Sequence, residues 1–320
     1  MNIPNHMVVS DPLAAFEKEG MLKVIAPAKT NLVLAVGDRR PDGYHNTSTI
    51  MHALNLHDVL HVDYYPESAG GLELEVSCHA RENLEELEIL SEENLATRAI
   101  SLLAKKLNRT VDEKITIRIE KHIPLQAGLG GGSSDAAAAL VAAAHLWEIE
   151  PQSEPVLETA VQLGSDVSFF LFGGCAFLTG TGEEFQHMLT PMKKSVALIM
   201  PDRGVSTAEA YRTFDESPVP IPEDVLSETI AAKDASEVPL FNNLSTAAET
   251  LLPELVRIRT WAQQQEGVEG VLLSGSGSAT IVVCDSFNHA HYLVSGAKMQ
   301  GWWARTTSFS ALRAAIVPKR

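Results

Sequence analysis

Short apolar runs alternate with polar segments along the chain, and the spacing of the apolar residues predicts both strands and helices. Strict alternation of apolar and polar residues predicts strands, and apolar residues at every third or fourth position predict helices. Two further segments, 176–182 and 270–284, are typical of strand–turn–strand units. The predicted strands are 22–26, 31–36, 58–65, 72–76, 114–120 and 195–200, and the predicted helices are 94–107, 135–147, 156–163, 247–265 and 290–298. Because strands and helices mix without regular βαβ alternation, we expect an α+β fold in two lobes.

The pattern also suggests how the chain divides. Residues 1–20 show little periodicity and are predicted to form an N-terminal extension. The apolar run at 195–200 opens a second half, so we expect one domain over 21–192 and another over 193–320. A length of 320 residues suits two domains.

Composition limits the classes of partner. Hydrophobic residues make up 45% of the chain, enough for a substantial core. The net charge of −16 argues against a protein that coats nucleic acid or an anionic membrane, because both call for a basic surface. A small phosphorylated ligand, which needs only a few local cations, remains compatible with that charge.

The three cysteines, Cys78, Cys175 and Cys284, lie far apart and form no CxxC pair. That spacing favours reduced thiols and gives neither a disulfide framework nor a metal site. The N-terminal residues lack the pattern of a secretory signal, and no apolar run reaches the roughly 18 to 20 residues of a membrane span. We therefore expect a soluble, cytoplasmic protein.

The most distinctive segment is IPLQAGLGGGSSDAAAAL, residues 123–140, where glycines and serines lead into an alanine-rich helix. The mononucleotide P-loop needs a lysine after its glycines, and none follows here. The dinucleotide motif GxGxxG fails because Ser133 stands at its third glycine. Backbone N–H groups with the hydroxyls of Ser133 and Ser134 at a helix start favour a di- or triphosphate. The alternative is a tight turn that needs glycine for packing alone.

Four histidines, His45, His52, His57 and His61, raise the question of a metal. His57 and His61 would share a helix face, but residues 58–65 are predicted to be a strand. We therefore expect no zinc site.

Three motifs in order resemble those of the GHMP small-molecule kinases: APAKTNL at 26–32, the glycine loop, and LSGSGSA at 273–279. The likeness spans about residues 22–285. It implies the two-lobed GHMP fold, with an N-terminal ribosomal-protein-S5-like domain that binds ATP and a C-terminal ferredoxin-like domain.

Within that family, RPDGYH at 40–45 and LGSDVS at 163–168 resemble one member, whose substrate is a cytidine diphosphate-linked methylerythritol. Thr30 and Ser168 stand where leucine and proline are commonest in that member. The first 20 residues extend beyond its usual start.

The resemblance implies that Asp166 is the catalytic base and that Lys29 holds its carboxylate ionised. Asn31 would bind the substrate hydroxyl or phosphate. Local sequence alone favours an ordinary N-cap for Asp166, and the alternatives for the other two are a solvated loop lysine at Lys29 and a polar strand-edge residue at Asn31.

The same resemblance implies recognition of cytosine by Tyr44 and His45, which follow Gly43 and are expected to be exposed. Tyr211 would close on the base from the other lobe; the alternative is a helix tyrosine that packs between the lobes. The turn of Gly275, Ser276 and Gly277 would border the substrate and brace the glycine loop, or is a plain β-turn.

On the nucleotide side, the resemblance implies ATP and Mg²⁺ as cofactors, with no dedicated carboxylate cluster for the metal. Lys121 is open to the alternative of a solvated lysine at a strand end. The implied ATP-binding residues are Asn94, Leu95, Lys121, Pro124, Gly128, Leu129, Gly130, Gly131, Gly132, Ser133 and Ser134.

The predicted function is ATP-dependent phosphorylation of the 2-hydroxyl of that cytidine compound, in isoprenoid precursor synthesis by the non-mevalonate route. We expect a small-molecule substrate, neither nucleic acid nor membrane as partner, and a monomer or homodimer. The alternatives are a GHMP kinase for homoserine or mevalonate and a non-catalytic nucleotide-binding protein, which would need neither Lys29 nor Asp166.

Overall fold

The computed structural model describes residues 22–66, 70–81, 84 and 91–318. The predicted N-terminal extension and most of the acidic segment 81–93 lie outside the described residues. The strands are β1 (Leu22–Arg39), β2 (His45–Tyr65), β3 (Leu72–Ala80), β4 (Glu113–Lys121), β5 (Cys175–Thr179), β6 (Glu184–Leu189), β7 (Ser195–Met200), β8 (Phe241–Asn242), β9 (Val268–Leu273), β10 (Thr280–Cys284), β11 (Trp303–Ser308) and β12 (Ala315–Ile316). The α-helices are α1 (Leu95–Lys106), α2 (Gly131–Leu146), α3 (Glu154–Leu163), α4 (Val167–Phe172), α5 (Thr207–Glu216), α6 (Glu223–Ala231), α7 (Ser245–Leu251), α8 (Glu254–Gln263) and α9 (Phe287–Met299).

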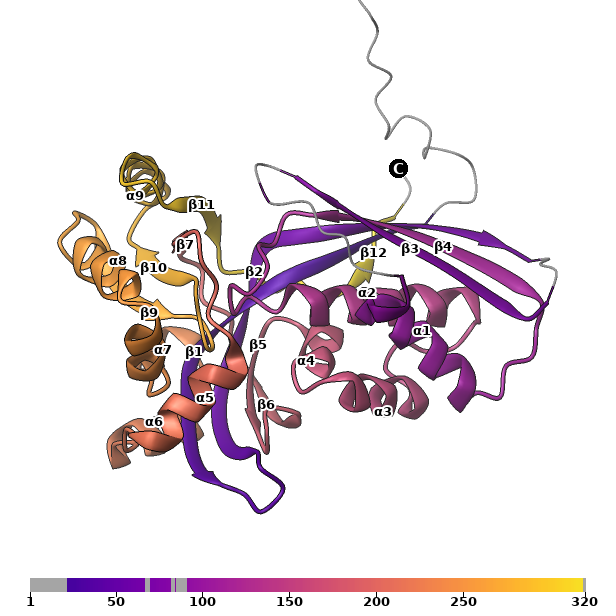
Figure 1. Ribbon diagram of the computed structural model, residues 1–320, viewed down its shortest axis with the longest axis horizontal. Coiled ribbons are helices and arrows are strands. Elements are labelled where there is room, and N and C mark those ends of the chain that lie inside the picture. The colour runs from indigo at the N-terminus through magenta and orange to yellow at the C-terminus, as the bar shows by residue number, and fades with distance from the viewer. Residues whose placement is uncertain (1–21, 67–69, 82–83, 85–90, 319–320) are drawn as a thin grey trace, which may run out of the picture.

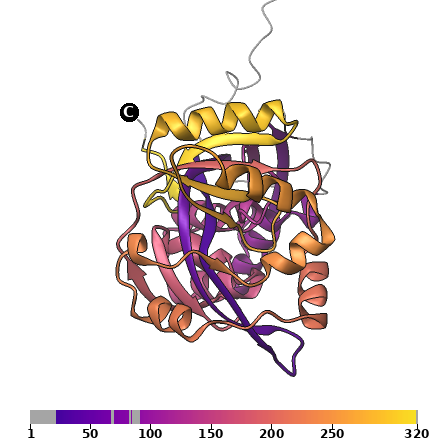
Figure 2. The same ribbon diagram turned by 90° about the vertical axis from the view of Figure 1, so that its left-hand side faces the viewer.

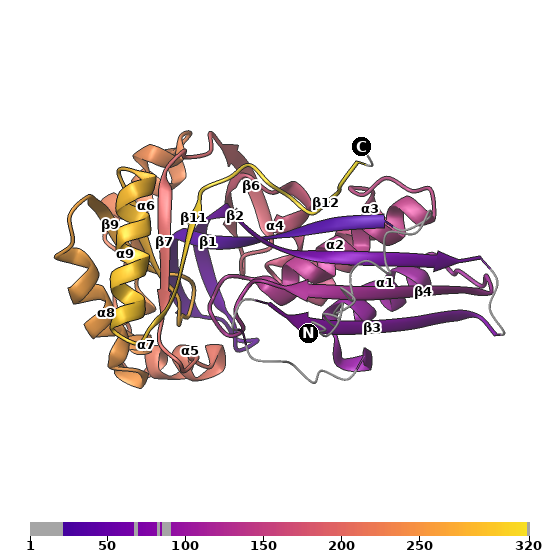
Figure 3. The ribbon, with the colours of Figure 1, turned by 90° about the horizontal axis from the view of Figure 1, so that it is seen from above.

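The first lobe is a sheet with helices on one face (Figure 1). Its strand order is β12-β1-β2-β4-β3, with β5 and β6 continuing from β2 and β8 pairing with β1. Figure 3 shows the long strands lying over α1, α2 and α3. The main apolar core fills the space between them, where the inward residues of β4, Ile115, Ile117 and Ile119, are fully buried. Alternation along β4 predicted this burial correctly.

β1 is one strand of 18 residues, where the sequence predicted two separated by a polar break. The pairing of β1 with β2 continues through this segment, with register shifts between Pro27 and Lys29 and between Asn31 and Val33. Such bulges re-aim side chains without ending a sheet, so the proline and polar residues were misread as a break. Lys29 is consequently a buried strand residue and is not a solvated loop lysine.

α2 begins at Gly131, four residues earlier than predicted, inside the glycine loop itself. Its alanines at 136–139 and 142–144 are completely buried. Side chains this small let α2 pack closely against α1, α4 and β1. The glycine loop is thereby held at a fixed place beneath the sheet.

The second lobe is a four-stranded antiparallel sheet in the order β11-β7-β10-β9. Figure 2 faces this lobe and shows α9, the yellow helix, lying along the sheet. The predicted helix 247–265 is two helices, α7 and α8, because Pro253 lacks the N–H that a continuous helix needs. The polar stretch 215–237 contains α6, which pattern analysis missed. None of the helices in the described part of the chain has both the length and the apolar character that a bilayer crossing needs.

The two lobes are joined by more than one connection. β8 and β12, both from the second half of the chain, pair with β1 of the first sheet. Leu54 of β2 also forms a bridge with Phe309. The long β1–β2 ribbon therefore contributes to both lobes and positions the residues between them.

Candidate active site

A cavity of about 740 Å³ lies where the two lobes meet. Its lining comes from β1, β2, the glycine loop, the start of α4, α5 and the turn between β9 and β10. A volume of this size suits a small-molecule ligand. The sequence-predicted residues in the lining are Lys29, Asn31, Tyr44, His45, Gly128, Gly130, Asp166, Tyr211, Gly275 and Ser276.

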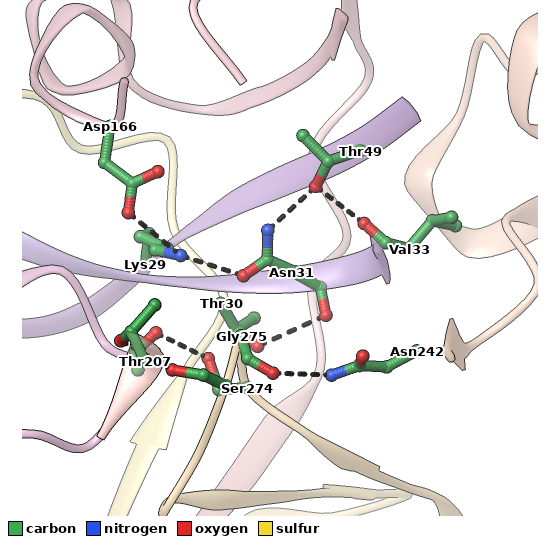
Figure 4. A network of polar contacts seen from close by, with 12 residues as sticks. Lys29, Thr30, Asn31, Val33, Thr49, Asp166, Thr207, Asn242, Ser274 and Gly275 are labelled. Atoms are coloured by element: carbon green, nitrogen blue, oxygen red, sulfur yellow. Dashed lines mark hydrogen bonds and ion pairs between the residues drawn. The ribbon is translucent and has the colours of Figure 1, made fainter. Parts of the chain in front are cut away.

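Lys29 and Asp166, 137 positions apart in the sequence numbering, form an ion pair with Nζ 3.1 Å from a carboxylate oxygen. Figure 4 shows the lysine of β1 facing the aspartate. Asp166 occupies the N-cap position of α4, as the local sequence indicates, but its side chain makes no capping hydrogen bond. The side chain of Asp166 is 27% exposed, whereas that of Lys29 is 6% exposed. The carboxylate is thus accessible to a ligand while a buried cation faces it.

Asn31 follows Lys29 by two residues and therefore lies on the same face of β1. Its Oδ1 accepts a hydrogen bond from Lys29 Nζ at 2.8 Å. Its Nδ2 donates to the hydroxyl of Thr49 at 2.8 Å. Thr49 was not singled out from the sequence, because it lies in part of β2 that was not predicted as a strand. The pairing of β1 with β2 is what brings it to Asn31.

The glycine loop, whose Gly128 and Gly130 line the cavity, leads directly into the N-terminus of α2. Gly130, in the left-handed region at φ 72°, precedes the first helical residue, Gly131. The N–H groups of Gly131, Gly132 and Ser133 have no helical carbonyl a turn earlier and remain available to an anion. Gly132 is exposed and Ser133 is half-buried, whereas Ser134 is fully buried. Only the first of the two predicted serine hydroxyls therefore reaches the surface.

The turn between β9 and β10 braces this loop. Ser274 Oγ donates to the carbonyl of Gly128 at 2.9 Å, and the amides of Ser278 and Ala279 donate to Gln126 and Ala127. A β-carbon on Gly128 would lie 2.0 Å from the carbonyl oxygen of Ser274.

Asn242 of β8 stabilises the turn between β9 and β10 through two hydrogen bonds. Its Nδ2 donates to the carbonyls of Leu273 and Gly275, at 2.9 and 2.8 Å. Sequence analysis missed this residue, because two adjacent asparagines, Asn242 and Asn243, give no local signal of a contact with a remote turn.

The residues that were expected to contact adenosine lie around the glycine loop and at the start of α1. Asn94 caps α1, since its Oδ1 accepts from the amide of Ala96 at 2.9 Å. Leu95 lies beside the glycine loop, with its Cδ1 3.5 Å from the position a β-carbon would take on Gly132. Pro124 and Leu129 are buried within the loop. Contact of Asn94, Leu95 and Pro124 with a nucleotide remains a prediction.

Lys121 is buried between two carboxylates and is not a solvated lysine. Its Nζ donates to Asp58 and, at 2.6 Å, to Asp135, the fifth residue of α2. Asp58 also accepts from the amide of Ile123 at 2.8 Å. Burial raises the pKa of Asp135 to about 7, with Lys121 opposing the shift and Asp58 adding to it. Lys121 therefore holds β4 to the helix that carries the glycine loop.

The far end of the cavity is formed by Tyr44, His45 and α5. Tyr44 is 64% exposed, as expected. His45 was also expected to be exposed, and that was wrong: it begins β2 and is 6% exposed. Its ring lies 5.2 Å from that of Tyr211 and 6.1 Å from that of Phe214. Local composition could not reveal this burial, because α5 comes from the other half of the chain.

Tyr211 lies in α5 and contacts the His45 ring across the lobes. Burial, with a smaller contribution from the charge of Asp166, raises the pKa of Tyr211 to about 12. Its phenol is therefore neutral near pH 7 and keeps its O–H as a hydrogen-bond donor.

The described residues contain no group of three or more His, Cys, Asp or Glu side chains that could hold a metal ion. Mg²⁺ that accompanies a nucleotide keeps several waters and takes one or two protein oxygens. The half-buried hydroxyl of Ser133, in the first turn of α2, is an oxygen of the kind such an ion accepts.

Comparison with known proteins agrees with this geometry. The family model for the GHMP kinases N terminal domain matches residues 94–174, which include the glycine loop and Asp166. A crystal structure of homoserine kinase from Cytophaga hutchinsonii superposes with a TM-score of 0.68 over 94% of this chain and 98% of that one. At 17% identity this similarity shows the fold alone. The fold and the glycine loop thus define a GHMP kinase, a class of small-molecule kinases that use ATP.

Two relatives are much nearer in sequence. A protein of Desulfitobacterium hafniense strain Y51 named 4-diphosphocytidyl-2-C-methyl-D-erythritol kinase is 40% identical over 279 residues, which is 86% of this chain and 91% of that protein. A crystal structure of 4-(cytidine 5'-diphospho)-2C-methyl-D-erythritol kinase, 32% identical, covers 90% of this chain and 99% of its own with a TM-score of 0.70. The chain belongs to the 4-diphosphocytidyl-2-C-methyl-D-erythritol kinase family.

Proposed function

We propose that this protein transfers the γ-phosphoryl group of ATP to the 2-hydroxyl of 4-diphosphocytidyl-2-C-methyl-D-erythritol, in the non-mevalonate route to isoprenoid precursors. The observation that supports it is the ion pair of Lys29 and Asp166, which shares one cavity with the base-binding candidates Tyr44, His45 and Tyr211. A phosphate-binding helix start and a nucleobase site at opposite ends of a cavity fit a substrate that joins a reactive alcohol to a nucleotide.

In this mechanism the 2-hydroxyl oxygen bonds to the γ-phosphorus while the bond from that phosphorus to the ADP oxygen breaks. Asp166 accepts the hydroxyl proton as the new bond forms. Lys29 keeps the carboxylate oriented, and its charge stabilises the transferred group. Asn31, fixed by its two hydrogen bonds, contacts the acceptor. Positioning and charge stabilisation, more than covalent chemistry, account for catalysis of this kind.

We further propose that ATP places its phosphates on the first turn of α2, against the amides of Gly131, Gly132 and Ser133. Mg²⁺ bound to those phosphates would neutralise part of their charge, with the hydroxyl of Ser133 as the side chain that fits it. Lys121 does not contact the phosphates in this proposal, because its ammonium is already bonded to Asp135. It supports α2 through that contact.

Cytosine is proposed to stack on the exposed ring of Tyr44, with Tyr211 approaching from α5 and His45 supplying polar groups to the base edge. The proposed domains remain 21–192, for ATP binding and catalysis, and 193–320. Because β8 and β12 pair with β1 of the first sheet, the second proposed domain is joined closely to the first domain.

The test is ADP release from purified protein with ATP, Mg²⁺ and one acceptor at a time. We expect turnover with 4-diphosphocytidyl-2-C-methyl-D-erythritol and none with homoserine or mevalonate. Cytidine diphosphate should compete with the acceptor and leave the KM for ATP unchanged. Turnover with homoserine or mevalonate instead would overturn the substrate assignment, and ATP binding without any turnover would overturn the enzymatic one.

A further inference from the structure

A chain of hydrogen bonds connects the backbone of β1 to the candidate base (Figure 4). Thr49 Oγ1 donates to the carbonyl of Val33 at 2.7 Å and accepts from Asn31 Nδ2 at 2.8 Å. Asn31 Oδ1 accepts from Lys29 Nζ at 2.8 Å. The same ammonium lies 3.1 Å from Asp166.

The direction of every bond in this chain follows from its first member. The carbonyl of Val33 can only accept, so it takes the single hydroxyl proton of Thr49. The lone pairs of that hydroxyl then face Asn31, and only the amide nitrogen of Asn31 can donate to them. The carbonyl oxygen of Asn31 is consequently left facing Lys29, as an acceptor for the ammonium.

Burial makes this orientation matter. Thr49 is 1% exposed, Asn31 2% and Lys29 4%, so bulk water has little access to replace a lost partner. If the amide of Asn31 turned over, its NH₂ would point at the ammonium of Lys29, and donor would face donor. In a buried site a mismatch of this kind is costly, so the Lys29 ammonium at one end and the Thr49 hydroxyl at the other together select one amide orientation.

The fold supplies the geometry. The register between β1 and β2 shifts between Asn31 and Val33, and a bulge at such a point re-aims the flanking side chains. Thr49 pairs with Leu34 on the far side of the shift. Its hydroxyl can therefore reach both Val33 and Asn31.

We propose that Thr49 is a positioning residue for phosphoryl transfer, whose hydroxyl fixes the Asn31 amide so that Lys29 is held against Asp166. The inference rests on the proposed roles of Lys29 and Asp166. Thr49 acts through Asn31, and its loss lowers the rate of the chemical step without weakening the binding of either substrate.

The first test is structural and does not depend on the acceptor. In crystals of Thr49→Val we expect the Asn31 amide to have turned or the Lys29 ammonium to have left it. Thr49→Ser should retain the original chain of hydrogen bonds. If Thr49→Val keeps both contacts of the Lys29 ammonium, the proposal is overturned.

The second test is kinetic and uses whichever acceptor the wild-type protein phosphorylates. Thr49→Val should lower kcat by roughly 10- to 100-fold with little change in either KM, and Thr49→Ser should restore it. Thr49→Ala, which removes the same hydroxyl, is measured beside it. The matched control is Thr159→Val in α3, which removes a fully buried hydroxyl bonded to the carbonyl of Pro155, outside the cavity lining.

A double-mutant cycle separates a positioning role from a structural one. In an Asn31→Ala background, Thr49→Val should cause little further loss, because the residue through which it acts is gone. Losses that multiply would overturn the proposal, as would a raised KM with unchanged kcat. Failure of the wild-type protein to use the cytidine compound would count against the proposed function and leave this comparison to be made with the accepted substrate and in the crystals.

Discussion

The imidazole Nε2 of His45 lies 2.7 Å from a carboxylate oxygen of Asp215, and the two residues come from different lobes. Asp215 is in α5, and the same face of that helix carries Tyr211 and Phe214, whose rings contact the imidazole. Residues three and four apart share a helix face, so α5 holds His45 with three side chains at once. The position of the second lobe is thereby coupled to the residue that is proposed to recognise the base.

Replacing Asp215 by asparagine should weaken binding of the cytidine substrate. A hydrogen bond to a charged group contributes about 1.5 to 3 kcal/mol, which corresponds to a KM for that substrate raised by roughly 10- to 100-fold. The KM for ATP should not change, since Asp215 lies at the other end of the cavity. Steady-state kinetics with each substrate varied in turn measures both.

Glu216→Gln is the matched control, because it removes the neighbouring, exposed carboxylate of the same helix. It should leave both KM values as they are. An Asp215→Asn protein with wild-type affinity for the cytidine compound would show that the contact across the lobes has no part in recognition.

Replacing Asp166 by asparagine should remove most turnover and leave ATP binding nearly intact. The amide keeps the size of the side chain but cannot accept the proton of the acceptor, and a general base typically contributes about 10²- to 10⁴-fold. We expect kcat to fall by that factor, with ATP affinity measured by calorimetry and thermal unfolding both close to wild type. A variant with undiminished kcat would remove Asp166 from the role of base.

The sequence carried more information about the first lobe than about the contacts between lobes. The alternation in β4 and the helical periodicity of α1 act over a few residues, so both elements were predicted closely. Lys29 and Asp166 were identified only through the resemblance, because each looks locally ordinary. Their pairing depends on the packing of α2 against both β1 and α4, which is a tertiary effect.

The burial of His45 and the contacts of Thr49 could not be predicted from neighbouring residues. His45 follows a glycine in a polar segment, which favours exposure, but α5 covers it from more than 160 positions away in the chain, the separation to Asp215 being 170. Thr49 gains its importance from the register shift between β1 and β2, which no residue pattern announces. Burial by a remote helix and strand register are both set by the fold as a whole.

Replacing Gly128 by alanine should destabilise the protein and weaken ATP binding. The backbone φ of 73° disfavours a side chain, and a β-carbon would lie 2.0 Å from the backbone oxygen of Ser274, which cannot move aside cheaply. We expect a loss of roughly 1 to 3 kcal/mol or more in the free energy of unfolding, measured with urea.

Gly132→Ala serves as the control for stability. A β-carbon there would make only an ordinary contact, 3.5 Å from Leu95 Cδ1. Its free energy of unfolding should equal or slightly exceed that of the wild type, since alanine favours a helix over glycine. Equal stability of Gly128→Ala and Gly132→Ala would contradict the close packing of the glycine loop against the β9–β10 turn.

Asp135 should make stability depend on pH. Burial raises its pKa from 3.8 to about 7, so the folded state retains a proton that the unfolded state releases between those values. The stabilising contribution is therefore complete below about pH 4 and is lost as pH rises through about 7. Asp135→Asn cannot ionise, so its stability relative to the wild type should rise over that window, by roughly 1 to 4 kcal/mol.

Urea unfolding of both proteins between pH 4 and pH 8 checks this expectation. Lys121 and Asp58, which contact one another beside Asp135, are unchanged in the variant. Asp202→Asn, at an exposed loop position, should show no such trend. A difference between Asp135→Asn and wild type that stays constant with pH would mean that Asp135 is ionised throughout, held by Lys121 against the cost of burial. In that case the ion pair of Lys121 with an ionised Asp135, and not a protonated Asp135, joins β4 to α2.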